Sequence, residues 1–242
     1  MNNERIIVIG DIHGCYYTLK ELWDKINPKQ TDFIVFLGDY IDRGANSYEV
    51  VEFLKEKKEQ FPNFTLLKGN HEDMCKKAII DNDDYLWLYN GGGTTIKSFE
   101  NHNADYHSLL PFLNSLVCFA TFEGGDFGHR LACVHANMPS AMTPEEENYR
   151  NLIWSREFIN NSDYMVVCGH TRHKHPRIYT NPHDIVCIDT GCVCGGELTA
   201  AIFKTGYIYP DFVSVAMDKR DDWANLCKTS WLKINYVGVL HF

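Results

Sequence analysis

Short apolar runs alternate with longer amphipathic stretches along the first third of the chain. The runs at residues 6–9, 33–37 and 64–67 are rich in β-branched and aromatic side chains, which favour strands. Between them, residues 17–25 and 48–57 repeat their apolar positions with the period of a helix. This order predicts a largely parallel sheet covered by helices.

The second half has a different pattern, with short apolar runs and few amphipathic stretches between them. We expect strands at residues 116–122, 131–134, 165–168, 185–188, 198–203 and 207–210. Together the two halves predict an α/β (α+β) fold, namely a sandwich of two mixed β-sheets flanked by α-helices.

No Pro/Gly/Ser-rich segment divides the chain, and its 242 residues, 45% of them hydrophobic, can bury one substantial core. We therefore expect residues 1–242 to form a single domain, with the motifs that carry chemistry inside residues 5–203. Residues 211–242 form a C-terminal extension of unknown role. We expect its Trp223, Trp231 and Tyr236 to pack on the core.

The formal net charge of −9 argues against a broad electrostatic grip on nucleic acid or anionic lipid. No run approaches the roughly 20 apolar residues of a membrane span, and the first residues lack a signal-peptide pattern, so we expect a cytoplasmic protein. The nine cysteines are irregularly spaced, which favours reduced, packed thiols. For Cys187, Cys192 and Cys194 we favour plain packing over zinc binding.

Polar clusters follow the first three predicted strands directly. In GDIHG, an extended backbone would point Asp11 and His13 to the same side, toward one metal, although a helix cap and a packed histidine explain them equally well. In GDYIDRG, Asp39 can bridge two metals, whereas Asp42 and Arg43 also fit a solvated turn. Ligands collect at the carboxyl ends of such strands, which favours one shared site.

The third cluster, GNHE, adds groups suited to proton transfer. Asn70 offers a neutral oxygen ligand, and His71 can transfer a proton near neutral pH. Asp42 could fix the tautomer of His71 and raise its basicity. We expect Glu72 to be a charge in the first turn of a helix rather than a ligand.

Two histidines follow strands in the second half, His135 in LACVHAN and His170 in VVCGHT. One such histidine is more often structural, but two of them, added to three earlier clusters, favour a second metal shell. Imidazole, carboxylate and amide ligands suit borderline divalent ions such as manganese, iron or zinc.

The motifs GDIHG, GDYIDRG, GNHE, VHA and GHT occur in this order, and the chain resembles the phosphoprotein phosphatase family of calcineurin-like metallophosphoesterases. The resemblance implies a β-sandwich flanked by helices and a proton donor, His71, paired with Asp42. It implies that Arg43 holds phosphate and, as in bacterial and phage members, that Arg156 does too, although Trp154 and Arg156 also fit the edge of a strand or helix with a surface charge. It also implies two metals, the first held by Asp11, His13 and Asp39, the second by Asp39, Asn70, His135 and His170.

The chain departs from eukaryotic members in having Lys68 before GNHE and Asn137 after VHA. These differences favour a bacterial or phage-type serine/threonine phosphatase and leave the substrate groove open. The stretch at residues 90–95, NGGGTT, resembles a substrate-facing segment of bacterial relatives, but a helix end followed by a new helix start explains it and is favoured. We expect His173 and His175 to be exposed loop residues.

The sequence therefore predicts a serine/threonine protein phosphatase-like phosphomonoesterase with two divalent ions, manganese first and iron or zinc as alternatives. Its substrate would be a phosphorylated protein or a small phosphoester, attacked in line by a hydroxide that bridges the metals. The alternative is a symmetric diadenosine tetraphosphate hydrolase, although such enzymes usually carry GNHD and GHW where this chain has GNHE and GHT. A catalytically dead binding module is disfavoured because all expected ligands are present. The sequence leaves the oligomeric state open.

Overall fold

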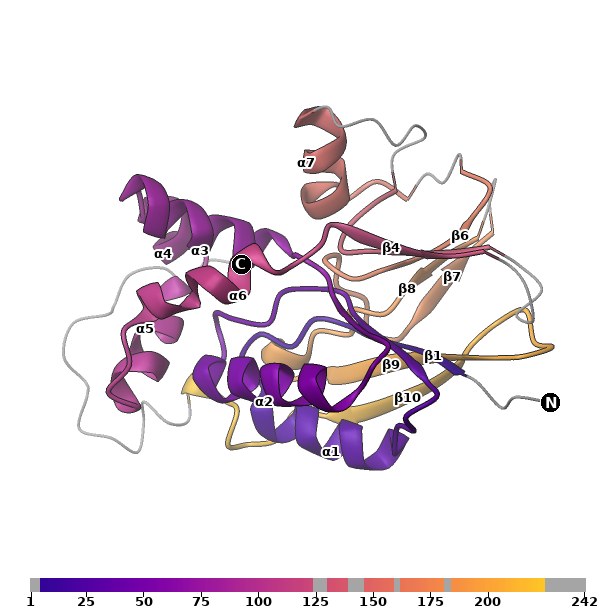
Figure 1. The fold of residues 1–242 in the computed structure, drawn as a ribbon, viewed down its shortest axis with the longest axis horizontal. Coiled ribbons are helices and arrows are strands. Elements are labelled where there is room, and N and C mark those ends of the chain that lie inside the picture. The colour runs from indigo at the N-terminus through magenta and orange to yellow at the C-terminus, as the bar shows by residue number, and fades with distance from the viewer. Residues whose placement is uncertain (1–4, 124–129, 139–145, 159–161, 181–183, 225–242) are drawn as a thin grey trace.

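Two β-sheets pack face to face, with helices on their outer faces (Figure 1). The computed structural model describes residues 5–123, 130–138, 146–158, 162–180 and 184–224. Helices α1 (Tyr16–Ile26) and α2 (Ser47–Gln60) cover the first sheet, and α7 (Glu146–Trp154) covers the second. The predicted sandwich of two mixed sheets flanked by helices is confirmed.

The first sheet has the strand order β10-β9-β1-β2-β3. The strands β1, β2 and β3 are parallel, whereas β9 is antiparallel to both β1 and β10. This confirms the predicted parallel start of the chain. The bounds are β1 (Arg5–Ile9), β2 (Phe33–Phe36), β3 (Phe64–Leu66), β9 (Glu197–Lys204) and β10 (Asp211–Ala216).

The second sheet has the order β4-β5-β6-β8-β7, with β5, β6 and β8 parallel and the two edge strands antiparallel to their neighbours. Four of these strands match predictions, and the short edge strand β7 was not predicted. The bounds are β4 (Phe119–Phe122), β5 (Leu131–Val134), β6 (Met165–Cys168), β7 (Arg177–Tyr179) and β8 (Ile185–Cys187).

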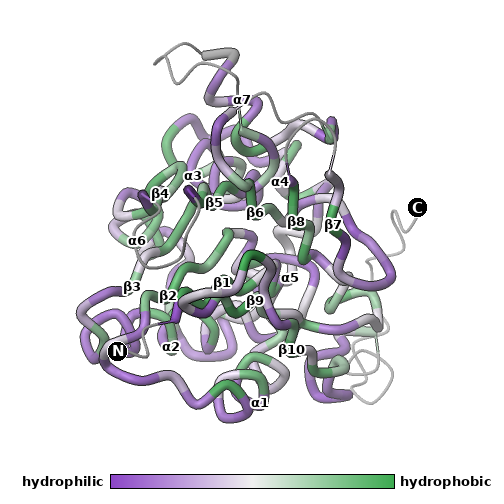
Figure 2. The backbone as a smooth tube through the Cα atoms, turned by 90° about the vertical axis from the view of Figure 1, so that its right-hand side faces the viewer, coloured by the Kyte–Doolittle hydropathy of each residue, from purple (hydrophilic) through white to green (hydrophobic). Residues whose placement is uncertain are grey.

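Alternating side chains divide the core into three layers. In β1, Ile6 and Val8 point between the sheets, where they join a cluster with Val186. Ile7 and Ile9 point the other way, into the core beneath α1 and α2. A third cluster lies between β5, β6, β8 and α7. Figure 2 shows the two sheets as two rows of mostly hydrophobic strands. Both faces of the central strands are buried, so they are continuously apolar.

A layer of short helices lies between β3 and β4 in the chain, and the sequence predicted it only in part, through a helix start at GNHE and a helix end and new start at residues 90–95. Figure 1 shows it to one side of the sheets. The layer consists of α3 (Asn70–Asp81), α4 (Tyr85–Tyr89), α5 (Gly92–Asn101), the 3₁₀ helix η1 (Tyr106–Leu109) and α6 (Leu110–Asn114). Helices α4, η1 and α6 have only four or five residues each, which is too short for a clear period of apolar positions.

The strand predicted at residues 207–210 is wrong. Gly206 has a φ of 83° and reverses the chain there, so the strand β10 begins only at Asp211. The first sheet therefore continues into the segment that we assigned to the C-terminal extension. A second 3₁₀ helix, η3 (Cys192–Cys194), precedes β9.

Residues beyond β10 attach to the helices of the first sheet. The buried carboxylate of Asp221 accepts hydrogen bonds from the backbone N–H groups of Tyr17 and Thr18, which lie in the first turn of α1. It also accepts one from the side-chain amide of Asn46, the residue before α2. A carboxylate at a helix N-terminus stabilises it. Of the three extension aromatics, Trp231 and Tyr236 lie outside the described residues.

Candidate metal centre

Six parallel strands end at one edge of the sandwich, and each is followed by a polar side chain. In the first sheet, Asp11, Asp39 and Asn70 follow β1, β2 and β3. In the second sheet, His135, His170 and Asp189 follow β5, β6 and β8. The carboxyl ends of parallel strands meet at one edge, so these side chains converge, as the sequence predicted for all of them except Asp189.

Asp39 is shared by two groups of side chains whose ligand atoms lie within 4.8 Å of one another. Its Oδ2 lies 3.4 Å from Nε2 of His13, in a group that also contains His71. Its Oδ1 lies 3.4 Å from Nε2 of His135, in a group that also contains His170. Each oxygen of one carboxylate therefore faces a different group, which is the arrangement that a bridge between two cations needs.

Main-chain carbonyls fix the ring orientation of three histidines. Nδ1–H of His13 donates to the carbonyl of Ile41 at 2.9 Å, and Nδ1–H of His135 donates to that of Leu37 at 2.9 Å. Nε2–H of His170 donates to a carbonyl of the α7 end at 3.2 Å. In the neutral ring the other nitrogen then carries a lone pair, and it points into the centre.

The side chains of the centre are better matched to bound cations than to hydrogen bonding with one another. The amide Oδ1 of Asn70 lies 3.1 Å from Nε2 of His135 and 3.1 Å from Nδ1 of His170, so that acceptors face acceptors. Oδ1 of Asp11 is buried without any hydrogen-bond partner, while its Oδ2 accepts from the backbone N–H of His170. Unpaired buried acceptors are costly unless a cation or a donor satisfies them.

Two glycines leave room for the carboxylates. A Cβ on Gly69 would lie 2.1 Å from Oδ1 of Asp39, and a Cβ on Gly169 would lie 2.0 Å from Oδ1 of Asp11. Neither position can hold a side chain while the carboxylate keeps its place. The motif glycines thus make room for the two carboxylates of the centre.

The backbone is strained where the motifs meet. Described residues other than glycine with positive φ are three asparagines and five motif residues, the latter being His13, Asp39, Asp42, Arg43 and His170. Such conformations cost roughly 1 kcal/mol or more each and tend to persist at functional sites. The extended backbone that we expected through His13 is wrong, since its φ is 47°. The ring still reaches the centre because the chain turns there.

His71 is held by a side chain, Asp42, rather than by a backbone group. Its Nδ1–H donates to Oδ2 of Asp42 at 2.7 Å, and its Nε2 is buried without a partner. Asp42 in turn accepts from Nε1–H of Trp87 at 3.0 and 2.9 Å and from the hydroxyl of Thr95 at 2.6 Å. A carboxylate held this firmly fixes the tautomer of the ring.

The two arginines lie at the exposed rim of the centre. The guanidinium of Arg43 donates to Nε2 of His13 at 3.0 Å, and its backbone N–H donates to the carbonyl of Gly91. Arg156 is exposed, and its charge contributes to lowering the pKa values of His135 and His170. Arg43 therefore contacts the centre directly, whereas Arg156 acts on two of its histidines through its charge.

Residues 90–95, NGGGTT, both join two helices and face the centre. Helix α4 ends just before Asn90, and α5 begins at Gly92, so the predicted helix end and new helix start are confirmed. The same stretch faces the centre, because Gly91 contacts Arg43 and Thr95 holds Asp42.

Burial sets the charge state of the rings. It lowers the pKa of His170 to about 3, with His135 adding to the effect. It also lowers the pKa of His13 and of His135 below the ordinary value. All three rings are therefore neutral near pH 7, which is the form that binds a metal.

The carboxylates crowd one another. Burial by itself would raise the pKa of Asp39, but the surrounding histidines bring it well below its ordinary value. Burial raises the pKa of Asp11 strongly, and Asp189 and Asp39 add to this. It raises the pKa of Glu72 to about 8 and that of Asp189 to about 6, with Asp39 contributing to both. Such crowding of negative charge favours a bound cation.

Two buried acids of the centre were missed or undervalued. Glu72 does lie in the first turn of α3, as expected, but its carboxylate also accepts hydrogen bonds from the backbone N–H groups of Asp39, Tyr40 and Gly69 at 2.8–2.9 Å. It thereby holds the loop that carries Asp39. Asp189 follows β8 in IDTG, which is the same strand-then-acid pattern as GDIHG and could have been found from it.

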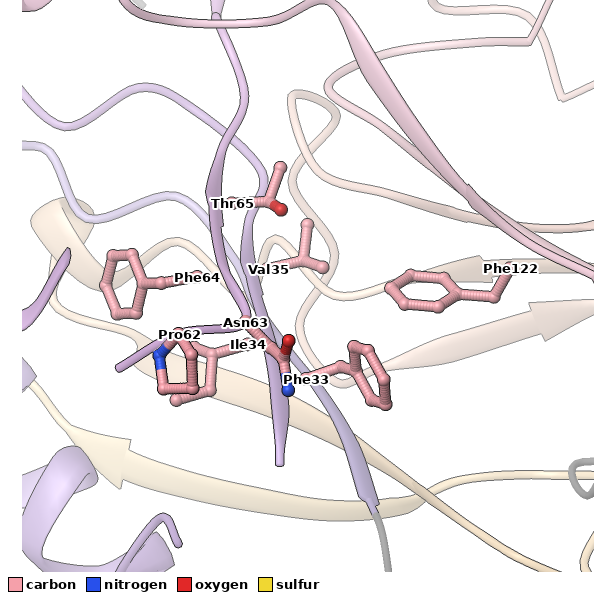
Figure 3. A pocket seen from close by; sticks show the side chains of 8 residues that line it. All are labelled: Phe33, Ile34, Val35, Pro62, Asn63, Phe64, Thr65 and Phe122. Carbon is pink, nitrogen blue, oxygen red and sulfur yellow. The ribbon is translucent and has the colours of Figure 1, made fainter. Parts of the chain in front are cut away.

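Other candidates lie apart from the centre. A surface pocket of about 300 Å³ lies at the amino ends of β2 and β3 (Figure 3), and no ionisable side chain lines it.

His175 is exposed as expected, but His173 is half-buried and contacts the rings of Phe158 and Tyr179, which corrects that expectation. Among the cysteines, Cys187 and Cys192 are buried, whereas Cys194 is exposed and does not pack as we expected. Within the described ranges, no helix is both long and apolar enough to cross a membrane.

Comparison with known proteins gives concordant matches. Residues 4–199 match the family described as calcineurin-like phosphoesterase. The serine/threonine-protein phosphatase 1 of Salmonella typhimurium is 31% identical over 210 residues, which cover 83% of this chain and 92% of that protein. The asymmetrical bis(5'-nucleosyl)-tetraphosphatase PrpE of Halalkalibacterium halodurans is 27% identical over 228 residues, covering 81% and 89% respectively.

A solved structure shares the fold. The crystal structure of a putative diadenosine tetraphosphatase superposes with a TM-score of 0.62 at 21% sequence identity, covering 90% of this chain and 99% of that one. At this level of identity the likeness extends to the arrangement of the sheets and helices.

Proposed function

The chain belongs to the calcineurin-like phosphoesterase family, and we propose that it is a serine/threonine protein phosphatase that uses two divalent ions. The family shows that it is a metal-dependent hydrolase of phosphoesters. The observation that carries the finer proposal is His71, whose Nε2 has no partner while Asp42 holds its other nitrogen. A held proton donor matters most for a poor leaving group such as a seryl or threonyl alkoxide.

We propose Asp11, His13 and Asp39 as ligands of one ion and Asp39, Asn70, His135 and His170 as ligands of the other. The shared carboxylate, the lone pairs aimed at Asn70 and the unpartnered oxygen of Asp11 support this assignment. Manganese suits such an oxygen and nitrogen set, with iron or zinc as alternatives. When bound, the two ions would lower the pKa of a water and neutralise charge on phosphoryl oxygens.

The protein's own side chains supply orientation and the proton. Arg43 at the rim binds phosphate oxygens, and Arg156 does so from the other side. In its imidazolium form, with both ring nitrogens protonated, His71 gives the Nε2 proton to the departing oxygen and returns to the neutral ring, while Asp42, which accepts from Nδ1–H, stabilises the charged form and its orientation. Glu72 keeps the Asp39 loop in place. We also propose that residues 1–242 form one domain, whose first sheet includes β10.

A second candidate is hydrolysis of a dinucleoside tetraphosphate. It is supported by the 27% identical relative named asymmetrical bis(5'-nucleosyl)-tetraphosphatase, whereas the sequence motifs had suggested a symmetric enzyme as the alternative. The two modes give different products from diadenosine tetraphosphate. Asymmetric cleavage yields ATP and AMP, and symmetric cleavage yields two ADP.

The test compares substrates on one metal-loaded preparation. A phosphoserine peptide, diadenosine tetraphosphate and nitrophenyl phosphate are assayed side by side, with and without a chelator. The proposal expects the peptide to have the highest kcat/KM of the two biological substrates and all turnover to stop on chelation. A dominant kcat/KM for diadenosine tetraphosphate would replace it with the second candidate. Full activity after complete metal removal would overturn both.

A further inference from the structure

The helix α4 has a buried face and an exposed apolar face. Its Trp87 is fully buried, whereas Tyr85 is 76% exposed, Leu86 51%, Leu88 40% and Tyr89 59%. Ile80, at the end of the neighbouring α3, is also exposed. Residues 80–89 thus hold five of the eleven exposed large hydrophobic residues in the described part of the chain. Such concentrations mark interaction sites on soluble proteins.

This exposed face is directly joined to the catalytic groups. Nε1–H of Trp87 donates to both carboxylate oxygens of Asp42, the partner of His71. Just after the helix, the carbonyl of Gly91 accepts the backbone N–H of Arg43 at 3.3 Å. Only the thickness of α4 therefore separates its exposed side chains from the proton donor. In Figure 1, α4 lies at the outer flank beside α3.

The face carries unbalanced negative charge. Asp81 ends α3, Asp83 and Asp84 immediately precede α4, and all three are exposed. No ion pair to any of them occurs within the residues that the structure describes, because the nearby Lys77 pairs with Asp73 instead. The whole chain adds to this potential with its net charge of −9. The face is therefore both apolar and acidic.

Charge complementarity favours a basic peptide as the partner of this exposed face. A second copy of this acidic chain would bring like charges together, and a dinucleoside polyphosphate or anionic lipid would also be repelled. A peptide with Lys or Arg next to apolar side chains carries the opposite charge and is not repelled. The rings of Tyr85 and Tyr89, whose centroids lie 6.4 Å apart, offer faces for a guanidinium or ammonium group.

We infer that the exposed face of α4, formed by Tyr85, Leu86, Leu88 and Tyr89 with the acids at residues 81–84, docks basic and apolar residues that flank the phosphorylated residue of a protein substrate. The inference rests on the proposed phosphatase function and narrows its substrate class. Reach is sufficient, because an extended peptide covers about 3.3–3.6 Å per residue and five helical residues rise only about 7.5 Å. A few residues beyond the phosphate are enough.

The test uses two phosphoserine peptides of equal length on the metal-loaded full chain. One carries Arg and Leu around the phosphoserine, and the other carries Asp and Ser. Nitrophenyl phosphate is the third substrate because it is too small to span α4. The wild type should prefer the basic peptide by about tenfold or more in kcat/KM, mainly through KM, and added salt should reduce the preference.

Two variants remove the apolar and the acidic parts separately. Y85S/L86S/Y89S should lower kcat/KM for the basic peptide at least about fivefold more than for nitrophenyl phosphate. D83K/D84K should reverse the preference between the two peptides. The matched control is Y207S/I208S, which removes two equally exposed residues from the turn between β9 and β10, at the end of the first sheet opposite the centre. It should leave both peptide values unchanged.

The outcomes separate the two proposals. If the wild type hydrolyses both peptides equally and the α4 variants follow the control, the docking surface is wrong while the phosphatase function stands. If the α4 variants lose all three substrates equally, or change the oligomeric state on size exclusion, α4 is a structural or self-association element, which also overturns the docking surface. If the wild type turns over neither peptide, the proposed function fails and the docking inference falls with it.

Discussion

The centre has two sides, separated by Asp39, and they are built differently. On the side of the proposed proton donor, called the donor side and comprising His71, Asp42, Trp87 and Thr95, side chains hold one another through hydrogen bonds. On the ligand side, comprising Asn70, His135 and His170, the ring nitrogens that point away from Asn70 donate to main-chain carbonyls. A carbonyl cannot be removed by substitution, whereas an indole N–H or a hydroxyl can.

This difference determines which parts of the centre substitutions can alter. The fold itself fixes the ligand side, since the carbonyl that holds His135 belongs to the opposite sheet, at Leu37. The donor side depends on residues from the helical layer, whose sequence can change without moving a strand. We therefore expect proton donation and metal binding to respond independently to substitution. Asp39 is the exception, because it touches both sides.

The largest expected effect is at Asp39, which belongs to both sides. Asp39→Asn removes the shared negative charge, so it should empty both metal positions and reduce turnover by more than about 10⁴-fold, equivalent to roughly 5 kcal/mol of barrier. Elemental analysis and steady-state kinetics measure this. Asp32→Asn is the matched control, because this buried acid of the same sheet pairs with Arg5 away from the centre. Equal metal loss in both variants would mean that unfolding, not ligation, is responsible.

The next effect isolates the donor side. His71→Asn should reduce kcat for a phosphoserine peptide by about 10² to 10⁴, and visibly less for nitrophenyl phosphate, whose leaving group needs little protonation. Metal content should remain at the wild-type level. His107→Asn, at an exposed histidine of η1, serves as the control. Since His71 lies in one of the two ligand groups, loss of a metal in His71→Asn would make it a ligand and refute the donor role.

A smaller effect is expected at Trp87, which contacts Asp42 rather than His71. Trp87→Phe keeps an aromatic ring but removes the N–H that Asp42 accepts, so turnover of the peptide should fall by about tenfold with the same leaving-group dependence as His71→Asn. Trp23→Phe, a comparable change in the core beneath α2, should affect thermal stability but not this dependence. A loss that is equal for both leaving groups would place Trp87 in packing alone.

The smallest effect, below about 1 kcal/mol between pH 7 and pH 6, concerns protonation of His170 in the metal-free protein. Because burial lowers the pKa of His170 to about 3, its ring should stay neutral in the metal-free protein at pH 6, where an ordinary histidine is largely protonated. The unfolded chain would take up that proton near pH 6.5. This contribution to stability is therefore complete above about pH 6.5 and is lost, at about 1.4 kcal/mol per pH unit, as the pH falls toward 3. Ring chemical shifts followed by NMR test this, and an imidazolium signal at pH 6 would contradict it.

The sequence by itself determined the ends of the strands and the residues gathered there. Apolar runs of four or five residues, each followed by a polar motif, are local signals, and Asp11, Asp39, Asn70, His135 and His170 all lie where those signals place them. Parallel strands bring their carboxyl ends to one edge of a sheet, so the convergence followed from topology alone. The fold class followed from the same pattern.

Only the tertiary structure decided how these residues are supported. The hydrogen bond that Trp87 donates to Asp42 spans 45 positions of sequence, and the one that Thr18 donates to Asp221 spans 203. No local pattern encodes which indole will meet which carboxylate, because packing of the short helices α3 to α6 sets that pairing. The end of the sheet at β10 and the apolar outer face of α4 were hidden for the same reason. Strand and turn signals act over a few residues, whereas burial and charge depend on the whole chain.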